Sequence, residues 1–180
     1  MIIGLTGTFG AGKDAVSEYL AEKGFEHIST SDILREVAKE RSLGLDRETV
    51  RMLSNNLKKE FDSAILAKMA VEQKSKKNLV ISALRDIGEI DYLKTIDNFK
   101  LIFVDAPIEI RYERLIKRSR DDQEKKLTLE ELKEKEQLEM SGKSSQRIDL
   151  CKEKADYIID NSGTIEGLNK KIDKILENIS

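Results

Sequence analysis

A glycine-rich loop near the start of the chain constrains the fold more than any other feature. Within GLTGTFGAGKD, residues 4–14, Gly7, Gly12 and Lys13 match the pattern G-x-x-x-x-G-K. This pattern is typical of loops whose backbone N–H groups and lysine hold phosphate groups. It directly follows a short apolar stretch and directly precedes a helical pattern. Because the motif requires that strand–loop–helix order, a phosphate-binding loop is favoured over a simple glycine turn with an exposed lysine.

Short apolar stretches alternate with longer helical patterns along the rest of the chain. Strands are predicted at residues 2–6, 25–29, 78–82, 100–105 and 155–160. Helices are predicted at 13–23, 31–41, 46–75, 87–97, 107–118, 128–140 and 164–179. Strands that alternate with helices form βαβ units with right-handed crossovers. We therefore expect one α/β domain over residues 1–180, with a five-stranded parallel sheet between two layers of helices.

The composition argues against several classes of protein. The 180 residues include 32 Lys and Arg against 34 Asp and Glu, so bulk charge does not favour binding to nucleic acid or to an anionic membrane. Cys151 and His27 are each the only residue of their type, which excludes an internal disulfide and a zinc cluster. No apolar run approaches the ~18 residues of a membrane span. We expect a cytoplasmic protein in which Cys151 is a small buried residue and His27 a packing or surface residue.

The loop residues predict a binding site for the phosphates of a donor nucleotide. The residues expected around these phosphates are Gly7, Thr8, Phe9, Gly10, Ala11, Gly12 and Lys13. The glycines allow sharp turns, and the helix that follows adds partial positive charge. Asp14 stands where such loops usually carry a Ser or Thr that binds Mg²⁺. Its carboxylate is either a hard oxygen ligand for Mg²⁺ or a charge that stabilises the first helical turn.

With these features the chain resembles the nucleoside monophosphate kinase-like P-loop kinases, which include adenylate kinases, deoxynucleotide kinases and dephospho-coenzyme A kinases. The resemblance runs through four blocks, the first being the loop. The second block, ISTSDILRE at residues 28–36, is similar to the stretch that begins the acceptor-binding helices of adenylate kinases. It implies that residues 31–77 form an acceptor-binding insertion in which Asp32 and Arg35 line the site. Alternatively, Arg35 is a surface residue of a helix that Ser31 or Asp32 caps.

The third block is LVISALRD, residues 79–86, and is similar to a strand end in adenylate kinases. The resemblance implies that Arg85 is the second arginine that holds the acceptor phosphate. Ser82 stands where that family has Asp, while Asp14 stands where the loop usually has a hydroxyl. We expect this pair still to supply one carboxylate and one hydroxyl around Mg²⁺ and its waters.

The fourth block, VDAPIEIRYERLIKRSR at residues 104–120, is similar to the strand and helix that lead into the lid of these kinases. The resemblance implies a short lid within residues 119–150. It also implies that Arg114 and Arg118, with Arg120 as a further possibility, contact ATP and the transferring phosphoryl group. Arg111 shares their helix face, and the alternative is a solvated stripe of ion pairs.

The end of the chain, ADYIIDNSGTIEGL, resembles the last strand and helix of dephospho-coenzyme A kinases. The resemblance implies that Asn161 lies near the adenine of the donor. A simple turn before the last helix is the alternative reading of this segment.

Together these features predict an ATP- and Mg²⁺-dependent phosphotransferase. Lys13 would hold the donor, Arg35 and Arg85 the acceptor, and Arg114 and Arg118 would neutralise the transition state, since phosphoryl transfer depends on positioning and positive charge. The acceptor is expected to be a small phosphorylated molecule, foremost a (deoxy)nucleoside monophosphate.

Two alternatives remain open at the sequence level. Dephospho-coenzyme A would be attacked through a ribose hydroxyl, and Asp32 is then the best-placed general base. The chain could instead be a nucleotide-binding module or NTPase without an acceptor. The sequence specifies neither an oligomeric state nor a choice between ATP and GTP.

Overall fold

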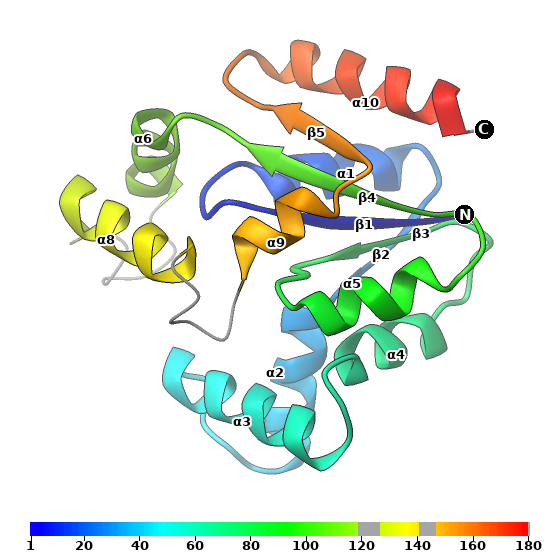
Figure 1. Cartoon of the computed structure of the whole chain (residues 1–180), viewed down its shortest axis with the longest axis vertical. Coiled ribbons are helices and arrows are strands. Elements are labelled where there is room, and N and C mark those ends of the chain that lie inside the picture. Colours follow the sequence, from blue (N-terminus) through cyan, green and yellow to red (C-terminus); the bar gives the residue numbers. More distant parts are fainter. Residues whose placement is uncertain (119–126, 141–146, 180) are drawn as a thin grey trace.

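A five-stranded parallel sheet forms the centre of the molecule. The computed structural model describes residues 1–118, 127–140 and 147–179 (Figure 1). The strands are β1 (Ile2–Gly7), β2 (Glu26–Ser29), β3 (Leu79–Ser82), β4 (Phe99–Asp105) and β5 (Tyr157–Asp160). Their order is β2-β3-β1-β4-β5 and every pairing is parallel, which confirms the predicted fold class.

The helices lie between the strands in sequence, as the alternating pattern predicts. They are α1 (Lys13–Glu22), α2 (Thr30–Glu40), α3 (Arg47–Glu60), α4 (Ile65–Glu72), α5 (Ile87–Lys94), α6 (Ile108–Arg118), α8 (Leu129–Met140), α9 (Ile148–Glu153) and α10 (Ile165–Ile179). None of the described helices is both long and apolar enough to cross a membrane.

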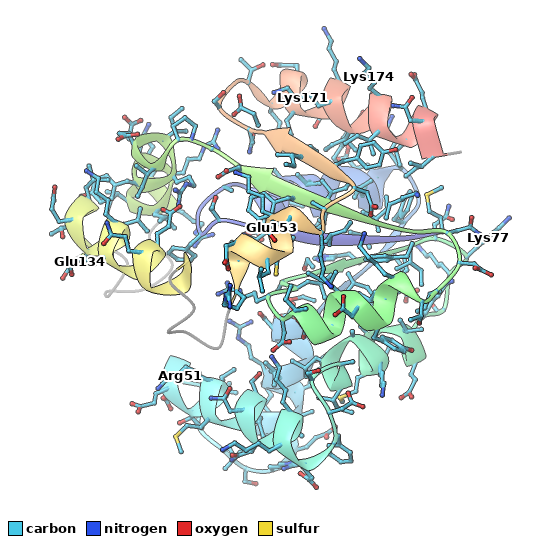
Figure 2. The ribbon with its side chains drawn as sticks, in the orientation of Figure 1. Arg51, Lys77, Glu134, Glu153, Lys171 and Lys174 are labelled. Carbon is cyan, nitrogen blue, oxygen red and sulfur yellow. The ribbon has the colours of Figure 1, made fainter. Side chains whose placement is uncertain are left out.

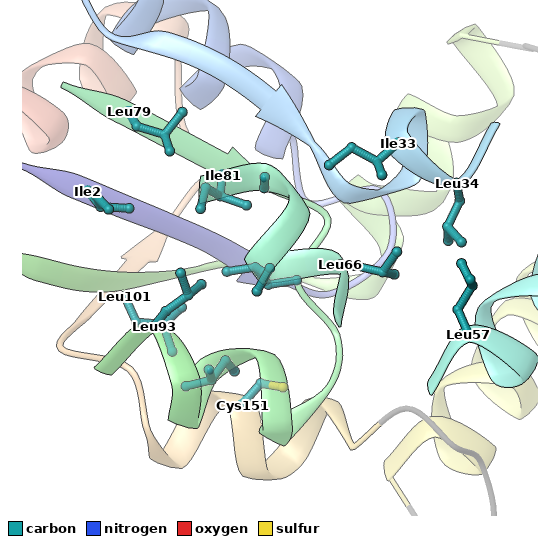
Figure 3. Close-up of a cluster of buried hydrophobic side chains, with 14 of the residues drawn as sticks. Ile2, Ile33, Leu34, Leu57, Leu66, Leu79, Ile81, Leu93, Leu101 and Cys151 are labelled. Carbon is teal, nitrogen blue, oxygen red and sulfur yellow. The ribbon is translucent and has the colours of Figure 1, made fainter. Parts of the chain in front are cut away.

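The two faces of the sheet carry separate hydrophobic clusters. On one face, α1 and α10 pack against side chains such as Ile3, Val80 and Val104. On the other face, residues of α2, α3, α4, α5 and α9 pack against strand residues that include Leu79 and Leu101 (Figure 3). Full burial of each large aliphatic side chain contributes about 1.5–3 kcal/mol. The two clusters therefore fix the three-layer arrangement.

Amphipathic helices present their charged sides to solvent. In α10, Ile172 and Ile175 are buried, whereas Lys171 and Lys174 are exposed on the outer side of the helix (Figure 2). This spacing is the helical period that the sequence predicts for the last segment.

Two elements differ from the sequence prediction. The predicted helix at 46–75 is two helices, because α3 ends at Glu60 and α4 begins at Ile65. At this break the Asp62 carboxylate accepts a hydrogen bond from the backbone N–H of Ala64 (2.8 Å). The short helix α9 was not predicted separately, and it places Cys151 in the core against the sheet.

Candidate donor and acceptor site

The glycine-rich loop connects β1 to α1 at the carboxyl edge of the sheet. Because β1 lies between β3 and β4, the loop sits where the strand order reverses, the usual place for a ligand in such folds. Gly7 and Gly12 have positive φ angles of 140° and 91°. A Cβ at Gly7 would lie 2.0 Å from the carbonyl oxygen of Val104, so only glycine fits.

Lys13 folds back across the loop. Its Nζ donates to the carbonyl oxygens of Gly7 (2.9 Å) and Thr8 (2.8 Å). Helix α1 begins at Lys13, and its N-cap residue is Gly12, which has no side chain to cap the helix. A helix start of this kind offers backbone donors and partial positive charge to an anion. The loop, the helix start and the ammonium group thus meet at one point, as the sequence predicts for a phosphate site.

Asp105 supports the loop from the end of β4, a role that the sequence analysis did not assign. The Thr8 hydroxyl donates to its Oδ1 (2.8 Å), and Lys152 of α9 donates to its Oδ2 (3.0 Å). Burial alone would raise the pKa of Asp105, but these two bonds outweigh it and hold the pKa below its usual range. The sequence feature that could have identified Asp105 is a carboxylate at the end of a buried parallel strand next to β1.

Arg111 and Asn161 also hold the loop. Arg111 is 3% exposed and donates to the carbonyl oxygens of Phe9 (3.2 Å) and Ala106 (2.7 Å). Asn161 is 6% exposed and its Nδ2 donates to the carbonyl oxygen of Ala11 (2.8 Å). Asn161 therefore lies against the loop, as part of a buried contact that neither sequence reading foresaw. Its expected position near an adenine base stays a prediction.

Arg114 lies beside the loop on α6. A Cβ placed on Gly12 would be 3.9 Å from Arg114 Nη1. This Nη1 atom is buried and has no hydrogen-bond partner among the residues that the structure describes. A buried charged donor without an acceptor is costly, so this group is well suited to bind an anionic ligand at the loop.

Arg118 and Asp14 form an ion pair of 3.6 Å between α6 and the first turn of α1. The Asp14 side chain is 59% exposed, and it lies in the helical turn where negative charge is stabilised. Asp14 therefore fits both interpretations: a charge that stabilises the first turn of the helix, or a ligand of the metal. Arg120 lies outside the described residues.

Ser82 lies at the end of β3 and is 8% exposed. Its Oγ is 2.8 Å from Nε2 of His27. His27 is exposed, which agrees with the packing or surface residue expected from sequence, and this contact is an additional feature. The Asp14 carboxylate and the Ser82 hydroxyl are hard oxygen donors, which suit Mg²⁺. Within residues 1–118, 127–140 and 147–179, no three His, Cys, Asp or Glu side chains are placed to hold a metal together. Mg²⁺ is usually held by one or two protein oxygens and by substrate phosphates, and the donor set present fits that mode.

The acceptor residues predicted from sequence lie on the segments that follow the neighbouring strands β2 and β3. Asp32 and Arg35 form an ion pair on α2 (2.9 Å), with side chains 67% and 53% exposed. Arg85 follows β3, and its backbone N–H donates to Oε2 of the buried Glu89 (3.2 Å). Burial raises the pKa of Glu89. The paired strands thus place the start of α2 and the residues that follow β3 at the same edge of the sheet as the loop.

Comparison with known proteins places this site in a family. The pattern of the AAA domain family (AAA_17) matches residues 6–133. A UPF0200 protein of Sulfurisphaera tokodaii is 34% identical over 180 residues, covering 99% of this chain and 97% of the relative. A UPF0200 protein of Thermococcus kodakarensis is 29% identical over 187 residues, covering 99% and 98%.

Solved structures share the fold over nearly the whole chain. TT1252 from Thermus thermophilus has a TM-score of 0.68 at 19% identity, with 100% of this chain and 98% of that chain covered. Shikimate kinase from Bacteroides thetaiotaomicron has a TM-score of 0.65 at 17% identity, with 98% of each chain covered. These similarities confirm the P-loop kinase fold that the sequence resemblance implied. The chain therefore belongs to the AAA domain (AAA_17) and UPF0200 families, as a P-loop kinase-like nucleotide-binding domain.

Proposed function

We propose that this domain is a phosphotransferase that moves the γ-phosphoryl group of Mg·ATP to a small phosphorylated acceptor, foremost a (deoxy)nucleoside monophosphate. The observation that carries the proposal is the position of Arg114. Its Nη1 is buried beside the loop and has no hydrogen-bond partner in the described part of the chain. A guanidinium held there gains an acceptor when nucleotide phosphate binds, and it supplies positive charge where phosphoryl transfer needs it.

The donor half of the site would use the loop and α6. Lys13 would leave the carbonyl oxygens of Gly7 and Thr8 and bind the β- and γ-phosphates. Arg118 would turn from Asp14 toward the transferring group, which would free the Asp14 carboxylate. Mg²⁺, when bound, would neutralise charge on the phosphate oxygens, with Asp14 and Ser82 as the protein oxygens that hold it or its waters.

The acceptor half would use the insertion at residues 31–77. Arg35 and Arg85 would bind the acceptor phosphate, since planar guanidinium groups bind phosphate with two parallel hydrogen bonds. A phosphate acceptor needs no general base. In this proposal the chain acts as one domain and the reaction takes place in the cytoplasm. The lid is assigned to residues 119–150, of which the structure describes 127–140 and 147–150.

A hydroxyl acceptor is the second candidate, and the Asp32 carboxylate favours it. Asp32 is 67% exposed at the start of α2, where a general base for a hydroxyl would lie. The structural neighbours include shikimate kinases, whose named substrate is a hydroxy acid without a phosphate. Dephospho-coenzyme A is another acceptor of this kind.

The test is ADP formation from Mg·ATP by the purified protein, with a panel of nucleoside and deoxynucleoside monophosphates, dephospho-coenzyme A and shikimate. Stimulation by one nucleotide class supports the main proposal. Stimulation by a hydroxyl acceptor alone, abolished by Asp32→Asn, supports the second candidate. Hydrolysis that no acceptor changes would contradict both and favour an NTPase. Lys13→Ala is the control, because it should remove every true activity of the site.

A further inference from the structure

His27 and Ser82 occupy one face of the sheet at its carboxyl edge. In the parallel pairing of β2 with β3, His27 aligns with Val80 and Ser29 with Ser82. Side chains two residues apart on a strand share a face, so His27 lies on the same face as Val80 and Ser82. Val80 packs in the cluster formed with α1. His27 and Ser82 therefore lie on the side of the sheet that α1 covers, and the first turn of α1 carries Asp14.

The contact between the two side chains is well defined. His27 Nε2 and Ser82 Oγ are 2.8 Å apart, and the Ser82 hydroxyl group is on a buried residue. The hydroxyl of Thr30 donates to the Ser82 carbonyl oxygen (3.3 Å), which fixes the backbone at the strand end. The imidazole is thus a side-chain partner through which the Ser82 hydroxyl can be oriented.

Above pH 7 a histidine ring with the ordinary pKa of about 6.5 is mostly neutral. A neutral imidazole has one N–H and one acceptor nitrogen. The hydrogen bond can therefore run in either direction: from Nε2–H of His27 to the Ser82 oxygen, or from the Ser82 hydroxyl to Nε2. The two directions leave different groups of Ser82 available to a ligand.

The direction of the hydrogen bond decides whether Ser82 can serve a cation. If His27 Nε2–H donates, it uses a lone pair of the Ser82 oxygen and leaves the hydroxyl hydrogen to point elsewhere, which repels a metal ion. If Ser82 donates to Nε2, both oxygen lone pairs remain for Mg²⁺ or for the hydrogen of a metal-bound water. Donating its hydrogen to Nε2 also polarises the Ser82 hydroxyl and makes its oxygen a better ligand.

We propose that His27 is a positioning residue of the magnesium site: its Nε2 accepts the hydroxyl hydrogen of Ser82 and thereby directs the lone pairs of that oxygen to the metal or its water. The inference rests on the proposed function, since it concerns the Mg²⁺ of the bound nucleotide. It explains why a serine at a strand end that usually carries a carboxylate can still serve the metal. Partners of this kind tune affinity through the ligand that they orient.

The first experiment needs neither metal nor activity. His27 is the only histidine of the chain, so untagged ¹⁵N-labelled protein gives one set of imidazole signals. Two-bond ¹H–¹⁵N correlation at neutral pH should show Nδ1 protonated and Nε2 unprotonated. Ser82→Ala should move the Nε2 signal, because it removes the donor. A ring protonated at Nε2 would overturn the proposal.

The second experiment measures how Mg²⁺ changes the binding of adenylyl-imidodiphosphate, with calorimetry in EDTA and in excess Mg²⁺. His27→Phe should leave Kd in EDTA unchanged and reduce the tightening by Mg²⁺ about tenfold. His27→Gln, whose amide oxygen can accept the hydroxyl hydrogen, should restore most of it. Ser82→Ala should match His27→Phe, and the double variant should lose no more than either single variant.

The outcomes separate the two proposals. Wild-type Mg²⁺ dependence in folded His27→Phe and Ser82→Ala proteins would overturn the role of His27 alone. Wild-type protein that binds no nucleotide in either buffer would overturn the proposed function and the role of His27 with it. If His27→Phe does not fold, the comparison of Ser82→Ala with wild type and the tautomer measurement still decide the matter.

Discussion

Breaking the ion pair between Arg111 and Glu136 should lower the stability of the fold strongly. Arg111 is almost fully buried, and its Nη2 donates to both carboxylate oxygens of Glu136 (2.9 and 2.6 Å). Glu136→Ala leaves a buried guanidinium without its counter-charge, and removing one partner of a buried pair costs about 3–5 kcal/mol. The Glu136 side chain is 22% exposed, so water can replace part of the loss. We therefore take the low end, about 3 kcal/mol.

That loss should lower Tm by about 6–12 °C, at about 2–4 °C per kcal/mol for a chain of this size. Urea unfolding followed by circular dichroism measures it directly, as a lower midpoint with an unchanged slope. Glu136→Gln keeps hydrogen-bond acceptor capacity but loses the charge, so its stability should fall between wild type and Glu136→Ala.

Lys117→Ala provides the matched control on the same helix as Arg111. Lys117 pairs with Glu113 at 4.0 Å, and the two side chains are 81% and 68% exposed. Exposed pairs of this kind contribute at most about 1 kcal/mol, so the midpoint should hardly move. The reasoning is refuted if Glu136→Ala is as stable as Lys117→Ala, because burial would then not decide the value of the pair.

Three further predictions concern Gly12, Cys151 and Glu89. Gly12→Ala should weaken nucleotide binding measured by calorimetry, because Gly12 has φ 91° and the new Cβ would lie 2.5 Å from Asn161 Nδ2; unchanged affinity would argue against a rigid loop. Cys151 has no exposed surface and burial raises its pKa to about 12, so a thiol reagent should label it only after unfolding in urea; fast labelling of the native protein would contradict this. Burial raises the pKa of Glu89 above its ordinary 4.5, so the folded state holds the proton more tightly and loses stability as pH rises from 4.5 toward neutral. Glu89→Gln keeps a side-chain oxygen as acceptor, so urea midpoints should favour this variant increasingly as pH rises, and a constant difference would count against the assignment.

The sequence predicted the elements of the fold because each carries its own local signal. Near-continuous apolar runs gave β3 and β4, and period-3.6 patterns gave α1, α6 and α10. The break after α3 was not predicted, because the apolar pattern continues across it. Aspartate often caps a turn, and Asp62 does so here. Helix α9 has six residues, too few to show a helical period.

The residues of the candidate site also divide into those that the sequence predicted and those that it did not. Gly7, Gly12 and Lys13 could be predicted because they are adjacent in sequence and form a motif. The roles of Asp105 and Arg111 as supports of the loop were not predicted, because their partners in the loop are 97 and 102 positions away in the chain. The His27–Ser82 contact spans 55 positions and depends on strand register. Contacts of this kind are set by topology, which the order of residues does not display.

Two of these distant supports act on the loop in one common way. Arg111 donates to the carbonyl oxygen of Phe9, and Asn161 donates to the carbonyl oxygen of Ala11. Both supports therefore bind oxygen atoms of the loop, which an anion repels, and leave the ligand to the nitrogen atoms. In a planar trans peptide, the C=O of one residue and the N–H of the next point in opposite directions.

The direction of each held carbonyl consequently sets the direction of an N–H group. With the Phe9 carbonyl turned toward Arg111, the N–H of Gly10 points away from α6. With the Ala11 carbonyl turned toward Asn161, the N–H of Gly12 points away from the end of β5. Gly10 and Gly12 have φ angles of 80° and 91°, which allow successive N–H groups to converge on an anion. The motif thus determines where the loop can turn, whereas side chains 102 and 150 positions later determine which way its donors face.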